Sequence, residues 1–188
     1  QKTPEVIEMY DIGDLIIYGN MGVFRIVDIS AKDLSEETRG QLHYTMKALY
    51  QECTVYVPVD NTKVFMRPVI SKEEAEKLID MIPSIQAEAY HTKVLSDLSR
   101  HYEEILKTHD CADLIELTMS IYAKKQMIEE QKKKFGSVNE RFMKKAEELL
   151  FGELSAVLGI PRSEVSKYIA SRVDALNAER RENYDECC

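Results

Sequence analysis

The sequence lacks the long apolar run that a membrane-spanning helix requires. No stretch of its 188 residues approaches about 18 consecutive apolar residues. Its first residues also lack the basic segment followed by an apolar one that marks a secretion signal. The four cysteines have no CxxC spacing, so neither a zinc site nor a disulfide framework is predicted. These absences favour a folded cytoplasmic protein with reduced thiols, no metal and no cofactor.

Common catalytic and nucleotide-binding motifs are absent as well. The sequence contains no GxGxxG, P-loop, HExxH or GxSxG. His109-Asp110-Cys111 invites a metal or nucleophile interpretation, but no second His or Cys lies at ligand spacing. Asp110 fits better as the N-cap of the helix that follows it. We therefore expect a protein that is not an enzyme.

Positive charge is scarce. The sequence has 25 Lys and Arg against 33 Asp and Glu, which gives a formal net charge of −8. A protein that coats nucleic acid through bulk electrostatics needs many basic residues facing phosphates. Any contact with DNA must therefore be local or weak.

Short apolar runs separated by turn formers occupy the first third of the chain. They predict strands over residues 15–18, 23–29, 42–50 and 54–59. Gly19-Asn20-Met21-Gly22 and Asp60-Asn61 supply residues that tolerate positive φ in tight reversals. We expect four or five strands in a small antiparallel sheet or barrel, whose longest loop is the polar stretch 31–41.

Helical periodicity begins after Pro68. Ser71 followed by Glu74 is a capping-box pattern, which predicts a helix to about Ile82 that Pro83 ends. Apolar residues at three- and four-residue steps predict four further helices, over residues 93–107, 112–132, 139–158 and 163–182.

Two further signals mark the ends of these helices. Ser137 with Glu140 predicts a second capping box, and Gly159 with Pro161 predicts a helix end. The fold class is thus α+β, a small antiparallel β domain followed by an all-α helical bundle. We expect a tail or added remnant at 1–8, the β domain at 9–70, the helical domain at 71–183, and a flexible tail at 184–188.

Residues 154–169 have the pattern of a helix-turn-helix. In that interpretation Arg162, Ser163, Ser166 and Lys167 begin a recognition helix, and the protein is a sequence-specific repressor. Two antiparallel core helices with a glycine cap are the commoner meaning of such a turn. Both interpretations stay open at this point.

The run from Tyr10 to Phe24, YDIGDLIIYGNMGVF, resembles the opening of the CarD (CdnL) family of bacterial transcription regulators. The same module is similar to the polymerase-interacting domain of transcription-repair coupling factors. Residues 55–61 and 67–71 resemble the end of that module. Residues 99–102 and 145–154 resemble segments of the family's helical half.

This resemblance implies a Tudor-like N-terminal domain that binds the RNA polymerase β subunit. It also implies a helical domain that contacts promoter DNA at the upstream edge of the bubble and stabilises the open complex. The residues implied to face polymerase are Lys32, Thr54, Val55, Tyr56 and Val57. Those implied to face DNA phosphates are Arg100, His101 and Lys145, with Arg141 beside them. The protein is expected to be a monomer and to have no membrane partner.

The sequence departs from the family at one position that bears on DNA contact. Family members commonly carry a Trp before the Ser-Arg motif, where it wedges into the minor groove, whereas this chain has no Trp and has Leu98 there. Leucine can act as an apolar wedge, and the alternative is that Leu98 packs inside the bundle. The missing Trp and the net charge of −8 also leave open an adaptor that does not bind DNA.

Overall fold

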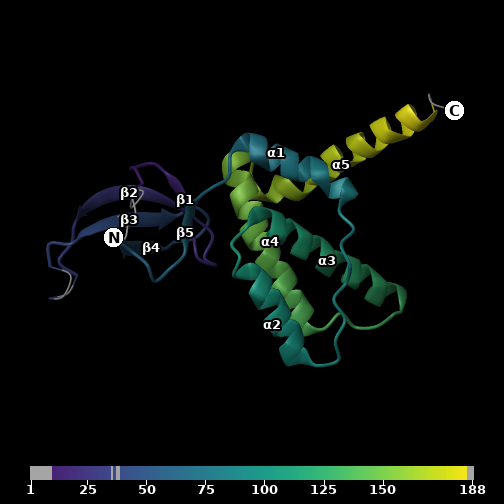
Figure 1. Cartoon of the computed structure of the whole chain (residues 1–188), viewed down its shortest axis with the longest axis horizontal. Coiled ribbons are helices and arrows are strands. Elements are labelled where there is room, and N and C mark those ends of the chain that lie inside the picture. The colour runs from purple at the N-terminus through teal and green to yellow at the C-terminus, as the bar shows by residue number, and fades with distance from the viewer. Residues whose placement is uncertain (1–9, 35, 37–38, 186–188) are drawn as a thin grey trace, which may run out of the picture. The chain divides into compact units, whose positions relative to one another are not determined.

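The computed structural model describes residues 10–34, 36 and 39–185. The chain divides between Val69 and Ile70 into two compact units, and each is described by itself. The expected tail at 1–8 and residues 186–188 of the second expected tail lie outside the described residues. The α+β expectation is confirmed, because an antiparallel sheet precedes five α-helices (Figure 1).

The first unit is one five-stranded antiparallel sheet with the strand order β4-β3-β2-β1-β5. Its strands are β1 (Leu15–Tyr18), β2 (Val23–Ala31), β3 (Leu42–Ala48), β4 (Thr54–Pro58) and β5 (Met66–Pro68). The four predicted strands are confirmed. The fifth has only three residues, too few to show an alternating pattern.

The core of the sheet comes from alternating residues of its strands. Apolar side chains from four strands are buried together, namely Ile16, Phe24, Ile26, Tyr44, Met46 and Val57. The pairing of β2 with β3 shifts register between Ile26 and Asp28. A bulge of this kind increases the local twist of the strand. The predicted reversal between β1 and β2 is confirmed, because Gly22 has φ +95° and accepts a hydrogen bond from Tyr18 N.

The second unit is helical. It contains α1 (Lys72–Met81), the short 3₁₀ helix η2 (Ile82–Ser84), α2 (Leu95–Leu106), α3 (Cys111–Glu130), α4 (Ser137–Leu158) and α5 (Arg162–Asp185). All five predicted helices are confirmed. Helix α5 continues two residues into the expected C-terminal tail. Within the described residues, no helix combines the length and the apolar character needed to cross a membrane.

Three of the four predicted capping residues are confirmed. Ser71 Oγ accepts from Glu74 N at 3.0 Å, and Asp110 caps α3 by accepting from the backbone of Ala112 and Asp113. Gly159 ends α4 in the left-handed conformation. The capping box expected at Ser137 is wrong, because Gly136 with φ 88° takes the cap position and makes Ser137 the first helical residue.

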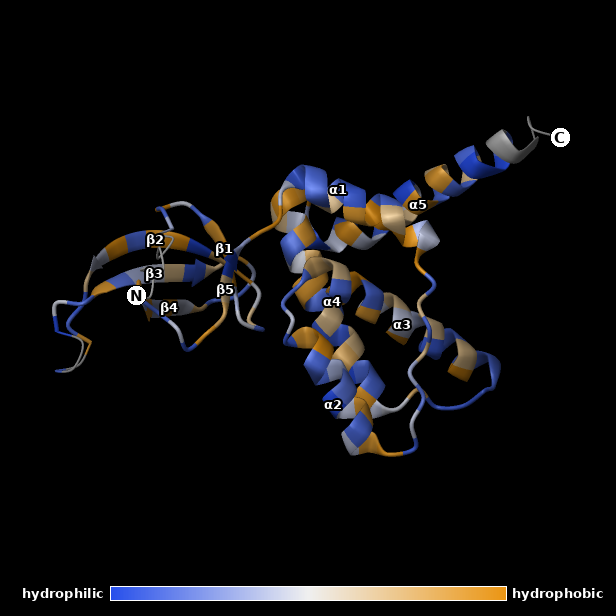
Figure 2. Ribbon diagram, in the orientation of Figure 1, coloured by the Kyte–Doolittle hydropathy of each residue, from blue (hydrophilic) through white to orange (hydrophobic). Residues whose placement is uncertain are grey.

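The helical unit has two buried clusters. One joins α1, α3, α4 and α5 around Ile79, Ile115 and Leu154. The other joins α2, α3 and α4 around Tyr102, Ile121 and Phe142. Figure 2 shows the corresponding alternation of hydrophobic and hydrophilic residues along these helices. This alternation lets each helix bury one face and expose the other.

Candidate functional site

Strand β4 lies at one edge of the sheet, with β3 as its only neighbour in the strand order. Ala48 N donates to Cys53 O at 2.9 Å, and Val59 N donates to Leu42 O at 3.1 Å. Antiparallel pairs alternate between bonded and non-bonded positions, so Val55 and Val57 bond to β3. The backbone N–H and C=O groups of Thr54 and Tyr56 therefore point away from the sheet. Within the described part of the chain, no strand pairs with them.

The side chains of β4 divide in the same alternating way. Thr54 and Tyr56 are exposed, and Tyr56 is 49% exposed as a residue. Val55 is half-buried, whereas Val57 is 3% exposed and belongs to the core of the sheet. The expectation that Val57 faces a partner is thus not supported by its position, since its side chain packs inward and its backbone bonds to β3. Thr54 and Tyr56 form the accessible part of this edge.

The opposite edge, β5, is protected. Gly19 N donates to Phe65 O and Val69 N donates to Leu15 O, so Met66 and Pro68 turn their backbone groups outward. Pro68 has no N–H, and its carbonyl accepts from Arg67 Nη1 at 3.0 Å. The Tyr10 hydroxyl donates to Met66 O at 3.4 Å. Of the two edges, β4 is therefore the one prepared to receive another strand.

Lys32, the other residue implied to face polymerase, follows the end of β2. Its ammonium lies 3.1 Å from Asp28 Oδ2. Hydrogen bonds from Ser30 and Lys32 lower the pKa of Asp28, which keeps the carboxylate charged. Because β3 lies between β2 and β4, Lys32 is one strand removed from the open edge.

Three of the residues implied to contact DNA are accessible on α2 and α4. Arg100 is exposed and pairs with Asp97 on the same helix. Arg141 is exposed, with its guanidinium 4.8 Å from the centre of the Phe142 ring, and Lys145 is half-buried. Arg141 and Lys145 each precede a buried residue of α4 that packs in the cluster shared with α2. They therefore lie beside the α2–α4 contact.

His101, the fourth of these residues, is half-buried. Its ring stacks on the ring of Tyr90 with centroids 3.8 Å apart and planes 13° from parallel. Tyr90 O in turn accepts a hydrogen bond from Lys124 Nζ of α3 at 2.9 Å. Burial lowers the pKa of His101, which favours the neutral imidazole. A stacked, half-buried and neutral ring is poorly suited to neutralise a phosphate, contrary to the expectation for His101.

The wedge expectation for Leu98 is corrected by its burial. Leu98 is 3% exposed and packs with Tyr102 and Leu106 in the cluster shared with α3 and α4. These positions follow the helical spacing of four residues, so they share the buried face of α2. The alternative interpretation of Leu98 as a core residue is the one that its position supports. Leu95, one turn earlier, is 65% exposed, and no sequence motif pointed to it.

The helix-turn-helix pattern at 154–169 corresponds to the end of α4, a turn at Gly159 and the start of α5. Leu154 and Val165 are fully buried on its inner side. The residues expected to read DNA are all exposed, namely Arg162, Ser163, Ser166 and Lys167. Their exposure is compatible with either interpretation, so recognition of a DNA sequence stays a prediction.

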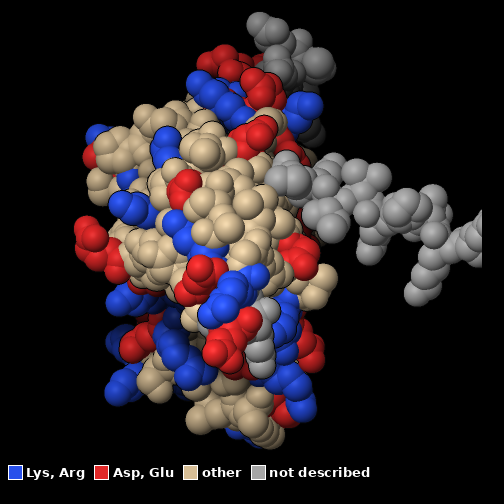
Figure 3. All heavy atoms as spheres, turned by 90° about the vertical axis from the view of Figure 1, so that its left-hand side faces the viewer, with Lys and Arg blue, Asp and Glu red and all other residues tan. Residues whose placement is uncertain are grey.

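The run His109-Asp110-Cys111 has a structural explanation. Asp110 caps α3, and Cys111 is 3% exposed in the core. Among the described residues, no three His, Cys, Asp or Glu side chains are grouped as metal ligands would be. On the face drawn in Figure 3, basic and acidic side chains are interleaved, so no field of one sign dominates that face.

Comparison with known proteins bears on the β unit alone. A search of curated proteins finds no match to the chain. A scan against protein families matches residues 10–70, a segment that contains all five strands, including the open β4 edge. Residues 10–70 are therefore similar to the family described as the CarD-like/TRCF RID domain.

Proposed function

We propose that this protein regulates transcription initiation by binding the RNA polymerase β subunit through its β unit. The observation that carries this proposal is the open edge of β4 inside the segment that matches the CarD-like/TRCF RID domain. Polymerase-interacting domains of this kind are protein-binding modules without chemistry of their own. The β unit accordingly recruits polymerase and catalyses nothing.

The mode of binding is strand addition to β4. The outward N–H and C=O groups of Thr54 and Tyr56 are offered to a partner strand, which gains about 1 kcal/mol from each net hydrogen bond. Pro58 follows in the same outward register without an N–H, so pairing ends there. The exposed Tyr56 side chain supplies aromatic contact area next to the backbone pairing.

The helical unit contacts promoter DNA at the upstream edge of the bubble and stabilises the open complex. Arg100, Arg141 and Lys145 carry this contact, because they are the accessible members of the implied set. A net charge of −8 keeps the interaction with DNA weak. Attachment to polymerase compensates by raising the effective concentration of the helical unit at the promoter.

The full-length protein tests this proposal through one backbone group. Tyr56→Pro removes the outward N–H of β4 while leaving the bonds that Val55 and Val57 make to β3. Tyr56→Thr removes the aromatic ring and retains the N–H. We expect Tyr56→Pro to abolish capture of polymerase and Tyr56→Thr to weaken it, with both variants still folded by thermal melting. Full binding by a folded Tyr56→Pro variant excludes strand addition to β4.

A second candidate function is sequence-specific repression through residues 154–169. The exposure of Arg162 and Lys167 at the start of α5 favours it. It predicts tight binding to one palindrome with loss on Arg162→Ala and Lys167→Ala. Two results together would favour regulation of initiation over repression. They are a selection from random DNA that returns no motif and a polymerase footprint that the protein alters. An unchanged footprint with intact polymerase binding indicates an adaptor that does not act on DNA.

A further inference from the structure

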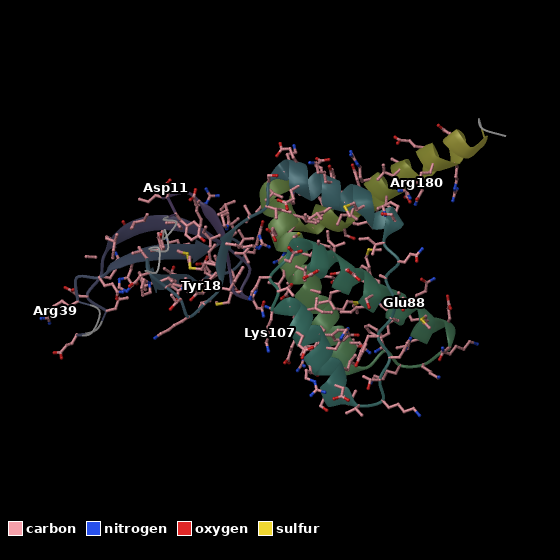
Figure 4. The ribbon with its side chains drawn as sticks, in the orientation of Figure 1. Asp11, Tyr18, Arg39, Glu88, Lys107 and Arg180 are labelled. Atoms are coloured by element: carbon pink, nitrogen blue, oxygen red, sulfur yellow. The ribbon has the colours of Figure 1, made fainter. Side chains whose placement is uncertain are left out.

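Residues 85–94, here called the strap, join η2 to α2 without regular secondary structure. Three contacts hold the strap to the helices. Ser120 Oγ donates to Glu88 O at 2.6 Å, Lys124 Nζ donates to Tyr90 O at 2.9 Å, and the Tyr90 ring stacks on His101. Ser120 and Lys124 are one turn apart on α3, so they bind the strap along one line. Figure 4 labels Glu88 on this connection, beside α3.

The strap is not backed by a solid core. A cavity of about 630 Å³ lies between it and the helices α2 and α3. The charged and titratable residues that line it are Glu88, His91, His101, Asp113 and Glu116. Beyond Ile85 at its start, Tyr90 is the strap residue that packs against a buried cluster. Segments with few buried apolar contacts open at low cost, so the polar contacts and the ring stack decide whether the strap is closed.

The charges around His101 favour its neutral form. Burial lowers the pKa of His101, the neighbouring Glu104 raises it, and the Lys124 ammonium lowers it, with a net decrease. Lys124 is 6% exposed, and burial lowers its own pKa as well. Glu88, Asp113 and Glu116 line the same cavity. Burial, the largest cause, and the Lys124 ammonium together outweigh the attraction of an imidazolium to Glu104.

We propose that the strap is an acid-released cover over His101, closed while the imidazole is neutral and opened when it gains a proton beside Lys124. Protons bind the open form more tightly than the closed one, since closure disfavours the charged ring. Closure is therefore fully favoured above the pKa of the open form, about 6.5 for a free His, and weakens as the pH falls below it.

Opening changes the surface that the proposed function assigns to DNA. The imidazolium of His101 becomes more accessible next to Arg100 on α2. It adds one positive charge to the few basic residues proposed to contact DNA. Affinity for DNA then rises on acidification by more than the change in bulk charge predicts. This consequence rests on the proposed function, whereas the opening of the strap does not.

The test follows the Tyr90–His101 stack in the full-length protein by NMR from pH 7.5 to 5.5. We expect the nuclear Overhauser contact between the two rings to disappear with the same midpoint at which His101 titrates. That midpoint should lie below the one measured for His101 in the urea-unfolded chain. A contact that persists after His101 is fully protonated overturns the proposal.

Three variants separate this switch from general acid sensitivity. His101→Gln removes the ring stack but cannot gain a proton, so the degree of closure should be the same at pH 7.5 and pH 5.5. The contact between Tyr90 and Lys124 measures this closure. Lys124→Met should raise the titration midpoint of His101, because the ammonium no longer opposes the imidazolium. His91→Gln is the matched control on the strap and should leave the response unchanged. Opening that persists in His101→Gln overturns the assignment to this residue.

The predicted effect on DNA is tested separately, by measuring the affinity of the protein for a DNA duplex at pH 7.5 and pH 5.5. A rise in affinity that is at least threefold smaller in His101→Gln than in the unchanged protein supports the link to DNA. Opening of the strap with no change in affinity supports the acid-released cover and counts against the DNA role of this surface. Failure of the acid-released cover and failure of the proposed DNA contact are thus distinguishable.

Discussion

The Glu153 carboxylate accepts a hydrogen bond from the backbone N–H of Ile70 at 3.1 Å, between residues 83 positions apart in the sequence. Glu153 is 1% exposed within α4, and Ile70 is the first residue of the helical unit. Ser71, the N-cap of α1, follows directly. The buried carboxylate therefore fixes the point at which the chain enters the helical unit.

Loss of this carboxylate should destabilise the helical unit. Glu153→Ala leaves the Ile70 N–H without its acceptor, which costs about 1 to 3 kcal/mol. Urea unfolding of the full chain measures this loss. Glu148→Ala, an exposed position on the same helix, is the matched control and should change stability by less than about 0.5 kcal/mol. Equal effects of the two substitutions contradict a structural role for Glu153.

Substitutions at Leu98 distinguish a core residue from a DNA wedge. Leu98→Ala creates a cavity and should cost about 2 to 5 kcal/mol of stability. Leu98→Trp overpacks the cluster and should cost about 1 to 3 kcal/mol. Leu95→Ala, at an exposed position, should leave the unfolding free energy nearly unchanged. Thermal melts check all three, and a Leu98→Trp variant that is stable and prolongs the open complex restores the wedge assignment.

The contact between α1 and α5 should weaken in acid. Arg172 Nε and Nη2 donate to the two carboxylate oxygens of Asp80 at 2.7 and 2.9 Å, and this pairing lowers the pKa of Asp80. A lowered pKa contributes stability that is present above the unfolded value of about 3.9 and lost as the pH falls through the folded value. Solvent screening keeps the contribution small, because both side chains are partly exposed.

Arg172→Leu should therefore lower the melting temperature slightly at pH 7 and have a smaller effect at pH 2. Asp80→Asn should reproduce the same trend. A difference between Arg172→Leu and the unchanged protein that is as large at pH 2 as at pH 7 assigns the effect to packing of the arginine stem instead.

The salt dependence of DNA binding should show whether Arg141 and Lys145, beside the α2–α4 contact, contact phosphates. Arg141→Ala and Lys145→Ala should each weaken binding to unrelated DNA duplexes alike and reduce the salt slope by about 1. Lys133→Ala, on the turn between α3 and α4, serves as the control at an exposed lysine outside the proposed set. A loss confined to one DNA sequence points to the helix-turn-helix interpretation.

Local patterns predicted most of the elements and missed what depends on contacts distant in the sequence. The strands 15–18 and 54–58 and the Ser71 cap follow from periodicity and one side-chain hydrogen bond, both of which are local. The cap at Ser137 failed because the pattern does not register the conformation of the preceding Gly136. Leu98 belongs to the apolar stripe of α2 by spacing alone, while the resemblance pointed to the surface.

The candidate site was predictable to a lesser degree. The segment containing β4 was identified, but the outward orientation of Thr54 and Tyr56 depends on their pairing register with β3. The cover over His101 depends on Tyr90 and Lys124, which lie in two other segments. No periodicity relates these residues, so only the folded chain reveals their contact.

The protected β5 edge limits what the sheet can assemble into. A sheet that is open on both sides can add strands without end, as in a fibril. Here Tyr10 and Pro68 protect the β5 side, which leaves β4 as the edge for strand addition under the proposed function. The proposed strand addition therefore predicts one strand-adding partner for each β unit, bound at β4.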